Sequence, residues 1–123
     1  MDVLKKNNYR TVLGGNIGAP VLNLKINKKD TAIIEASSFQ LSYSKFIYPN
    51  YAILLNITND HLDWHENMKD YINSKFKIFA NQNKYQFALI NRNFKYLFRK
   101  KKLLGKLIVP NLKKYIKIKL KMK

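Results

Sequence analysis

Short apolar runs that stop at polar residues are the feature of this sequence that most constrains its fold. Residues 31–34 (TAII) lead into Glu35, and residues 52–55 (AILL) lead into a loop that carries both histidines. A third run, FALI, occupies residues 87–90. Apolar runs without alternation are typical of strands buried on both faces of a parallel sheet, whose sites form at the carboxyl ends of the strands. We therefore expect polar site residues along one edge of such a sheet.

Turn and cap signals place helices between these runs. The expected strands are residues 11–13, 31–35, 51–57, 87–90 and 107–110. The expected helices are residues 4–9, 20–26, 37–46 and 67–80. This alternation predicts an α/β fold with a mostly parallel sheet flanked by helices. Residues 116–123 alternate with period two, which predicts a basic edge strand.

Composition limits the classes of protein to which the chain can belong. Its 123 residues suit one modest domain, and the absence of cysteine excludes disulfides and thiolate metal sites. Neither a membrane-spanning stretch nor a signal-peptide pattern is found, so we expect a cytoplasmic protein, and we expect it to be monomeric. The net charge of +17 is almost all lysine and accompanies many Asn and Ile residues, a bias that AT-rich coding alone can produce.

The same charge supports an alternative function. A basic nucleic-acid-binding module would use aromatic residues among cations, such as Tyr96 and Phe98, to stack bases. That hypothesis leaves the acidic residues near the strand ends unexplained. Nucleic acid is therefore not the expected partner.

Lys75 interrupts the apolar stripe of the helix expected at residues 67–80. The stripe consists of Met68, Tyr71, Ile72, Phe76 and Phe79. Lys75 follows Tyr71 by four residues and precedes Phe79 by four. It either extends its apolar stem over the core with its ammonium group in water or points into a site that tunes its basicity.

Two further groups could take part in chemistry. Glu35 ends a strand expected to be buried, where a carboxylate requires a cation or hydrogen bonds, so a metal and a lysine are both suitable partners. His61 lies between Asp60 and Asp63, with His65 further along the same loop. Such a loop is either a divalent-metal or proton-transfer site or a solvated surface loop.

Four ordered motifs resemble the central domain of the Mur ligases of peptidoglycan synthesis. They are GGNIG at residues 14–18, EASSFQL at 35–41, LNITNDHLDWH at 55–65, and Tyr71 with Lys75. The GGNIG and SSFQL forms resemble most closely the D-glutamate-adding members of this family. The resemblance covers residues 4–91, and residues 92–123 are interpreted as a continuation of the same domain.

The resemblance implies roles for individual residues. Glu35 matches a ligand of the magnesium ion that sits with the ATP phosphates, and His61 matches a catalytic ligand of a second magnesium ion. Lys75 matches a catalytic lysine that these enzymes carry as a carbamate, which supplies a further oxygen ligand. The implied substrate-binding residues are Asn16, Ser37 and Gln40.

The implied reaction is the ATP-dependent ligation of D-glutamate to UDP-N-acetylmuramoyl-L-alanine through an acyl phosphate. The family's ATP-binding motif G-x-x-G-K-[ST] does not occur in these 123 residues. Neither the N-terminal UDP-binding domain nor the C-terminal domain of the family is matched. We therefore expect residues 1–123 to be a truncated central domain of the P-loop NTPase type that is inactive alone. A degenerate relative without catalysis fits the same pattern.

Overall fold

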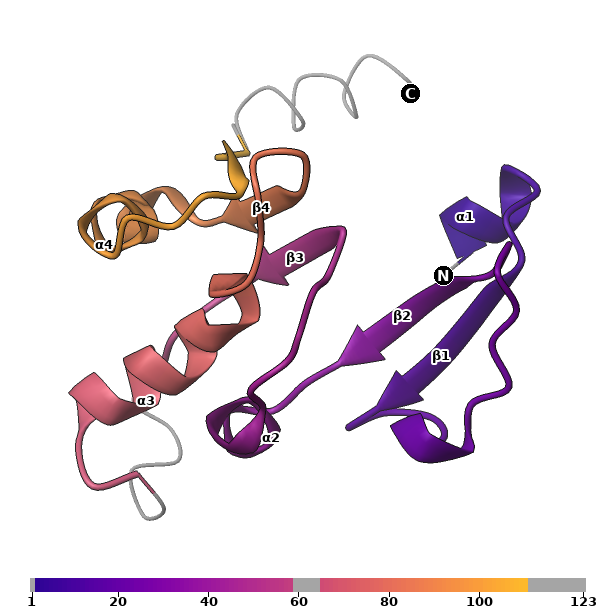
Figure 1. Ribbon diagram of the computed structural model, residues 1–123, viewed down its shortest axis with the longest axis horizontal. Helices are drawn as coiled ribbons and strands as arrows, with labels where there is room; N and C mark the ends of the chain where they lie inside the picture. The colour runs from indigo at the N-terminus through magenta and orange to yellow at the C-terminus, as the bar shows by residue number, and fades with distance from the viewer. Residues whose placement is uncertain (1, 59–64, 111–123) are drawn as a thin grey trace, which may run out of the picture. The chain divides into compact units, whose positions relative to one another are not determined.

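The computed structural model describes residues 2–58 and 65–110 (Figure 1). The chain divides into two compact units, Met1–Gln40 and Leu41–Lys123. Each unit contains its own parallel sheet. Parallel pairing with helical segments between strands confirms the predicted α/β class, with the pairing distributed over two sheets. The basic edge strand predicted at residues 116–123 lies outside the described residues.

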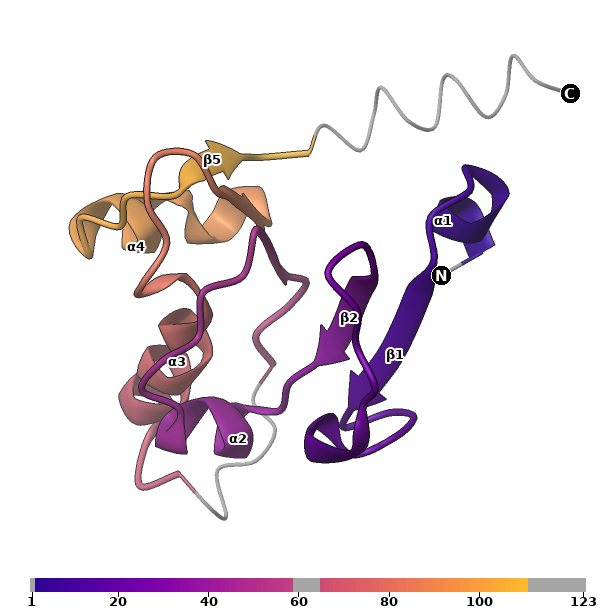
Figure 2. The same cartoon turned by 45° about the vertical axis from the view of Figure 1, so that its right-hand side comes forward.

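The first unit is built on two paired strands. Strands β1 (Thr11–Gly15) and β2 (Thr31–Glu35) run side by side in the same direction in Figures 1 and 2. Their register places Gly15 opposite Glu35. Both carboxyl ends therefore lie at one edge of this sheet, as the sequence predicts.

Helix α1 (Asp2–Lys6) precedes β1 and shares only residues 4–6 with the helix predicted at residues 4–9. Asn8 adopts a left-handed backbone conformation with φ 62°. The amide of Tyr9 donates to the Leu4 carbonyl at 3.0 Å, and the amide of Asn8 donates to the Lys5 carbonyl at 3.0 Å. This pair of bonds is a Schellman motif, which satisfies carbonyls at the helix end and turns the chain into β1.

The helix predicted at residues 20–26 is wrong. Only a single 3-10 turn, η1 (Val21–Asn23), forms there. Pro20 offers no side-chain cap, and Leu24 takes an extended conformation with φ −73° and ψ 123°. A Cβ atom at Gly14 would lie 2.6 Å from a methyl group of Leu24. The packing of Leu24 against Gly14 thus accompanies the end of the helical turn.

The second unit is a three-stranded parallel sheet with helices. Its strands are β3 (Tyr51–Leu54), β4 (Phe87–Ile90) and β5 (Lys106–Ile108), in the order β3-β4-β5. Its helices are α3 (Met68–Phe76), the 3-10 turns η2 (Lys77–Phe79) and η3 (Arg92–Phe94), and α4 (Lys95–Lys100). Its buried core consists of Ala52, Leu54, Phe76, Phe79, Ala88, Ile90 and Phe98. The predicted strands at 87–90 and 107–110 and the helix at 67–80 are confirmed within a few residues.

Two predicted elements are shorter than expected, and one helix was missed. Helix α2 (Ser38–Tyr43) spans the boundary between the units and ends before Phe46, while β3 ends at Leu54 and not at Ile57. Helix α4 was not predicted because basic residues interrupt its short apolar pattern. In the described part of the chain, no helix is long and apolar enough to cross a membrane.

The expectation that the strands are buried on both faces is wrong for β3. Ala52 and Leu54 are 1% and 7% exposed, whereas Tyr51 and Ile53 are 72% and 53% exposed. The core residues of α3, η2 and α4 gather with Ala52 and Leu54 on one face. An apolar run therefore marks this strand correctly but does not reveal that side chains on its other face are exposed in the described part of the chain.

Gln82 connects the beginnings of the strands in the second unit. Its side chain is buried, and its amide donates to the Pro49 carbonyl at 3.0 Å and to the Phe87 carbonyl at 2.9 Å. A Cβ atom at Gly105 would lie 2.5 Å from the Gln82 amide oxygen, so Gly105 leaves room for it. One side chain thus contacts segments that begin or precede β3, β4 and β5.

Replacing Gln82→Leu keeps the volume of the side chain but leaves two carbonyls without their donor. We expect the free energy of unfolding in urea to fall by about 2 kcal/mol, because unsatisfied buried acceptors are costly. The matched control is Gln86→Leu, which removes one exposed acceptor for the Asn83 amide. It should cost about 1 kcal/mol or less, and equal losses in the two variants would contradict the role of Gln82.

Candidate functional site

Glycine at the end of β1 allows a close approach to Glu35. Gly15 has φ +106°, and a Cβ atom there would lie 2.1 Å from the Glu35 carbonyl oxygen. Because any other residue would clash and be strained at this φ, only glycine fits this strand end without distortion. The next amide, of Asn16, donates to the same carbonyl at 2.8 Å. These contacts fix the main chain of Glu35.

The side chains of Asn16 and Glu35 also meet. The Asn16 amide nitrogen lies 3.4 Å from a carboxylate oxygen of Glu35, at the long end of hydrogen-bond distance. Asn16 therefore orients this carboxylate without neutralising it. Two residues predicted to have roles in one site are thus brought together at the carboxyl ends of β1 and β2.

Glu35 is exposed, contrary to the expectation that burial would require it to have a charged partner. The last two residues of β2, Ile34 and Glu35, both lie in contact with solvent. Water can solvate the carboxylate, so no desolvation penalty demands a metal ion or a lysine. The features of Glu35 that suit a metal ion are therefore its carboxylate oxygens and its position at the end of β2.

Ser37 and Gln40 form a capping box at the start of α2. The amide of Gln40 donates to the Ser37 hydroxyl oxygen at 3.3 Å, and the amide of Ser37 donates to the Gln40 side-chain oxygen at 2.9 Å. This reciprocal pair satisfies backbone donors that a helix start leaves unpaired. Both predicted substrate-binding residues therefore have a structural role that their S-x-x-Q spacing could have revealed.

Lys75 lies half-buried on α3, as its place in the apolar stripe predicts. Its Nζ atom donates to the Asn56 carbonyl at 3.2 Å. The same nitrogen lies 4.9 Å from the centroid of the buried Tyr71 ring. The amine of Lys75 thus contacts a backbone carbonyl and the face of an aromatic ring. Lys75 is thereby held near the carboxyl end of β3.

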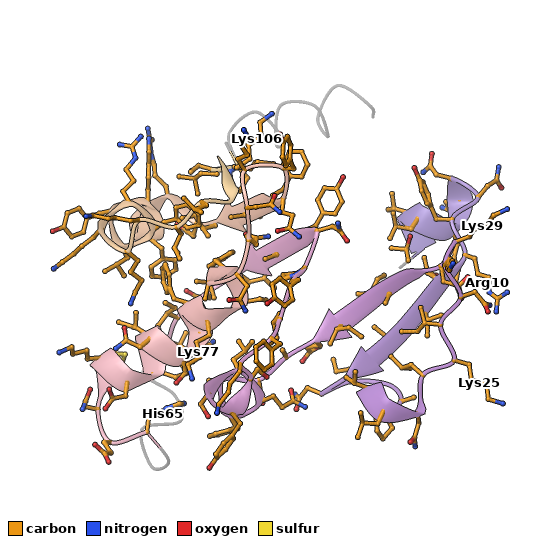
Figure 3. All side chains as sticks on the ribbon, in the orientation of Figure 1. Arg10, Lys25, Lys29, His65, Lys77 and Lys106 are labelled. Atoms are coloured by element: carbon orange, nitrogen blue, oxygen red, sulfur yellow. The ribbon has the colours of Figure 1, made fainter. Side chains whose placement is uncertain are left out.

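His65 is a buried residue to which sequence reasoning gave no separate role. It is 4% exposed, and its ring lies 5.1 Å from that of Tyr71 at an angle of 51°. Figure 3 shows His65 next to the chain that enters α3. His65, Tyr71 and Lys75 therefore form a connected series of contacts. Nothing in the spacing of the loop distinguishes this histidine from His61.

The roles that the resemblance implies require Glu35, His61 and Lys75 to converge around one cavity, and this convergence stays a prediction. Glu35 belongs to the first unit and Lys75 to the second, and His61 lies outside the described residues. Among residues 2–58 and 65–110, no group of three or more His, Cys, Asp or Glu side chains could hold a metal ion. The first unit also has an open pocket of about 630 Å³ between residues 8–10 and 27–30, which precede the strands and thus lie away from Glu35.

Comparisons with known proteins identify the relatives of this chain. The family described as "Mur ligase middle domain" matches residues 5–119. The chain is 42% identical over 94 residues to the UDP-N-acetylmuramoylalanine--D-glutamate ligase of Trichlorobacter lovleyi, covering 75% of this chain and 21% of the relative. It is 44% identical over 92 residues to the enzyme of the same name from Thermosipho africanus, covering 73% and 22%. The chain thus spans about a fifth of the length of these relatives.

Gly15→Ala should separate the ends of β1 and β2. We expect it to lower the free energy of unfolding by about 3 kcal/mol or more, because a positive φ and a backbone clash add together. Gly18→Ala is the matched control, since Gly18 also has a positive φ of +83° but its Cβ atom would come no closer than 3.1 Å to another atom. It should cost about 1–2 kcal/mol.

Hydrogen exchange of the Asn16 amide gives a local measurement of the same change. This amide donates to the Glu35 carbonyl, so it should exchange faster in Gly15→Ala than in Gly18→Ala. Unchanged exchange in Gly15→Ala would show that the close approach does not hold Glu35 in place.

Proposed function

We propose that this chain forms part of an ATP-dependent ligase that adds D-glutamate to UDP-N-acetylmuramoyl-L-alanine. The chain belongs to the Mur ligase family, because it matches the middle domain of that family. The match over residues 5–119 carries this proposal, and the names of the relatives supply the substrate. The meeting of Asn16 and Glu35 at the carboxyl ends of parallel strands supports the location of the site. A cytoplasmic location and a monomeric state are part of the same proposal.

The proposed reaction joins an acid to an amine in two steps. A substrate carboxylate oxygen attacks the γ-phosphorus of ATP, which gives an acyl phosphate and releases ADP. The amine of D-glutamate then attacks the acyl carbon, phosphate leaves, and the nitrogen loses a proton to form the amide. The first step brings two anions together, so cations must reduce their repulsion.

Glu35 is the proposed protein ligand of a magnesium ion, which would offset the charge of the ATP phosphates. Mg²⁺ prefers oxygen ligands, keeps several waters and uses few protein carboxylates. An exposed carboxylate oriented by a neutral amide fits that donor requirement. The chain itself contributes the position and orientation of this carboxylate. His61 is proposed as a catalytic ligand at a second magnesium ion, by resemblance.

Lys75 is proposed to carry a carbamate in the intact enzyme, which would make it an oxygen ligand. Carbamylation requires that the Lys75 nitrogen be free to react, whereas this nitrogen contacts the Asn56 carbonyl and the Tyr71 ring. Formation of the carbamate would therefore displace these two contacts. Asn16, Ser37 and Gln40 remain proposed substrate contacts, although the capping box already engages Ser37 and Gln40.

A chimaera tests whether this segment can serve in a ligase. The 92-residue part of this chain that matches the Thermosipho africanus enzyme would replace the corresponding segment of that enzyme. ADP release would be measured with both substrates, ATP, Mg²⁺ and bicarbonate. We expect ligase activity, and we expect Glu35→Gln and Lys75→Ala each to lower kcat by about 100-fold or more, as removal of transition-state charge stabilisation does. Lys69→Ala, an exposed change on the same helix, is the matched control and should alter kcat less than twofold.

The outcomes distinguish a segment that can serve in an active ligase from a degenerate relative without catalysis. A folded but inactive chimaera would indicate a degenerate relative without catalysis. An active chimaera that tolerates Lys75→Ala would refute the proposed role of Lys75 and leave the ligase assignment in place.

The 123-residue chain alone should release no ADP above background under the same conditions. The phosphate-binding motif G-x-x-G-K-[ST] does not occur in its sequence, so nothing there matches the family's means of holding ATP. The full-length Thermosipho africanus ligase serves as the positive control. Activity of the chain equal to that of this control would refute the prediction.

A further inference from the structure

Tyr71 is fully buried on α3 but lies apart from the core of the second unit. It is 1% exposed and is one of the three largest side chains that are completely enclosed in the described part of the chain. The core cluster of described residues contains Phe76 and Phe79, which follow it along the same helical stretch, but not Tyr71. A separate set of contacts therefore encloses this ring.

His65 supplies one of these contacts. The rings of His65 and Tyr71 lie 5.1 Å apart and are tilted by 51°, a favourable arrangement for two aromatic rings. His65 lies two residues before Asn67, the N-cap of α3, and is itself 4% exposed. The contact thus joins the chain that enters α3 to the beginning of the second helical turn.

The Tyr71 ring in turn contacts Lys75, one turn further along α3. The Nζ atom of Lys75 lies 4.9 Å from the Tyr71 ring centroid and donates to the Asn56 carbonyl at 3.2 Å. The side chain of Asn56 accepts a hydrogen bond from the Ile57 amide at 2.9 Å, which restrains the main chain at that carbonyl. Both groups that hold the Lys75 amine are therefore restrained by contacts of their own.

Two other roles for His65 are simpler. A direct catalytic role requires contact with a substrate, which a ring that is 4% exposed cannot make. A purely structural role would be that of a staple, since a residue just before a helix often packs against the fourth residue of that helix. A staple would affect stability alone, so it can be distinguished from a role in the reaction.

We propose that His65 is a positioning residue for Lys75, because its ring fixes the Tyr71 ring and that ring fixes the place of Nζ. This inference rests on the proposed ligase function, in which Lys75 carries a carbamate that supplies an oxygen ligand. Groups behind a metal ligand hold it in the orientation that binding requires. His65 thus influences a reaction that its own side chain does not touch.

The first test locates Lys75 in the complete 123-residue chain and needs no enzymatic activity. Protons above an aromatic ring are shielded by its electrons, so the methylene protons next to Nζ should show an upfield NMR shift. A Lys75→Arg variant assigns this signal by its disappearance. We expect His65→Leu to abolish the upfield shift and His65→Phe, which keeps a flat ring, to retain it.

Two further variants separate position from stability. His65→Met fills the space with a flexible apolar side chain that has no flat ring, so it should lose the shift as His65→Leu does. Phe79→Leu is the matched control, because the Phe79 ring centroid lies 5.8 Å from that of Phe76 and 5.5 Å from that of Phe98 within the core. It should lower the free energy of unfolding while the Lys75 signal keeps its shift.

The second test measures the reaction in the chimaera. We expect His65→Leu to lower kcat by about tenfold or more, the usual cost of losing support behind a metal-binding group. The bicarbonate concentration needed for half-maximal activity should rise, because a displaced Lys75 amine is less well placed to carry its carbamate. The KM for ATP should change by about twofold or less, since no contact with ATP is removed. Phe79→Leu should leave the bicarbonate requirement unchanged.

Several results would overturn the proposal. An unchanged Lys75 signal in His65→Leu or His65→Met would show that the histidine does not place the lysine. Loss of the signal in His65→Phe as well would assign the effect to the imidazole nitrogens and not to the ring contact. Equal changes in kcat and bicarbonate requirement in His65→Leu and Phe79→Leu would show an effect of stability alone. An inactive parent chimaera would refute the proposed function, whereas the NMR signal would still decide whether His65 positions Lys75.

Discussion

The candidate magnesium ligand depends on the contact between the end of β1 and the main chain of Glu35. Gly15 has no side chain, so its backbone can lie against the Glu35 carbonyl, and the Asn16 amide can donate to that oxygen. Parallel pairing then sets the two strand ends level with each other. The carboxylate is placed by the backbone around it, while its own oxygens stay accessible.

The sequence predicted the positions of strands and helices more accurately than the burial of their side chains. Apolar runs located β2, β3 and β4, and the stripe containing Tyr71 and Phe79 located α3, because these patterns reflect burial on at least one face. The pattern could not show that Ile53 on β3 is exposed among the described residues, since Ile53 is as apolar as a core residue. The sequence pattern also predicted a full helix after Pro20, where only a single turn forms. The contact of Leu24 with Gly14 could not be read from a local pattern, because it joins residues ten apart in the chain.

The candidate site was predictable to a similar degree. Asn16 and Glu35 lie together at the carboxyl ends of β1 and β2, the kind of edge at which polar site residues were expected. The buried environment expected for Glu35 is wrong, because this residue is exposed. The S-x-x-Q spacing contains a capping box, so local helix chemistry explains Ser37 and Gln40 before any substrate is considered. Lys75 lay where its periodicity placed it, whereas its contact with the Asn56 carbonyl required the three-dimensional structure.

Gln82 links the strands of the second sheet at only one of the two edges formed by the strand ends. Its hydrogen bonds join the segments that begin β3 and β4, and Gly105 packs against it ahead of β5. The amino-terminal edge of the sheet is therefore cross-linked through one side chain, so local opening of any of these strand starts would disturb its neighbours. The carboxyl-terminal edge has no share in this cross-link. A single substitution at Gln82 would consequently reach all three strands of this sheet from their amino-terminal edge.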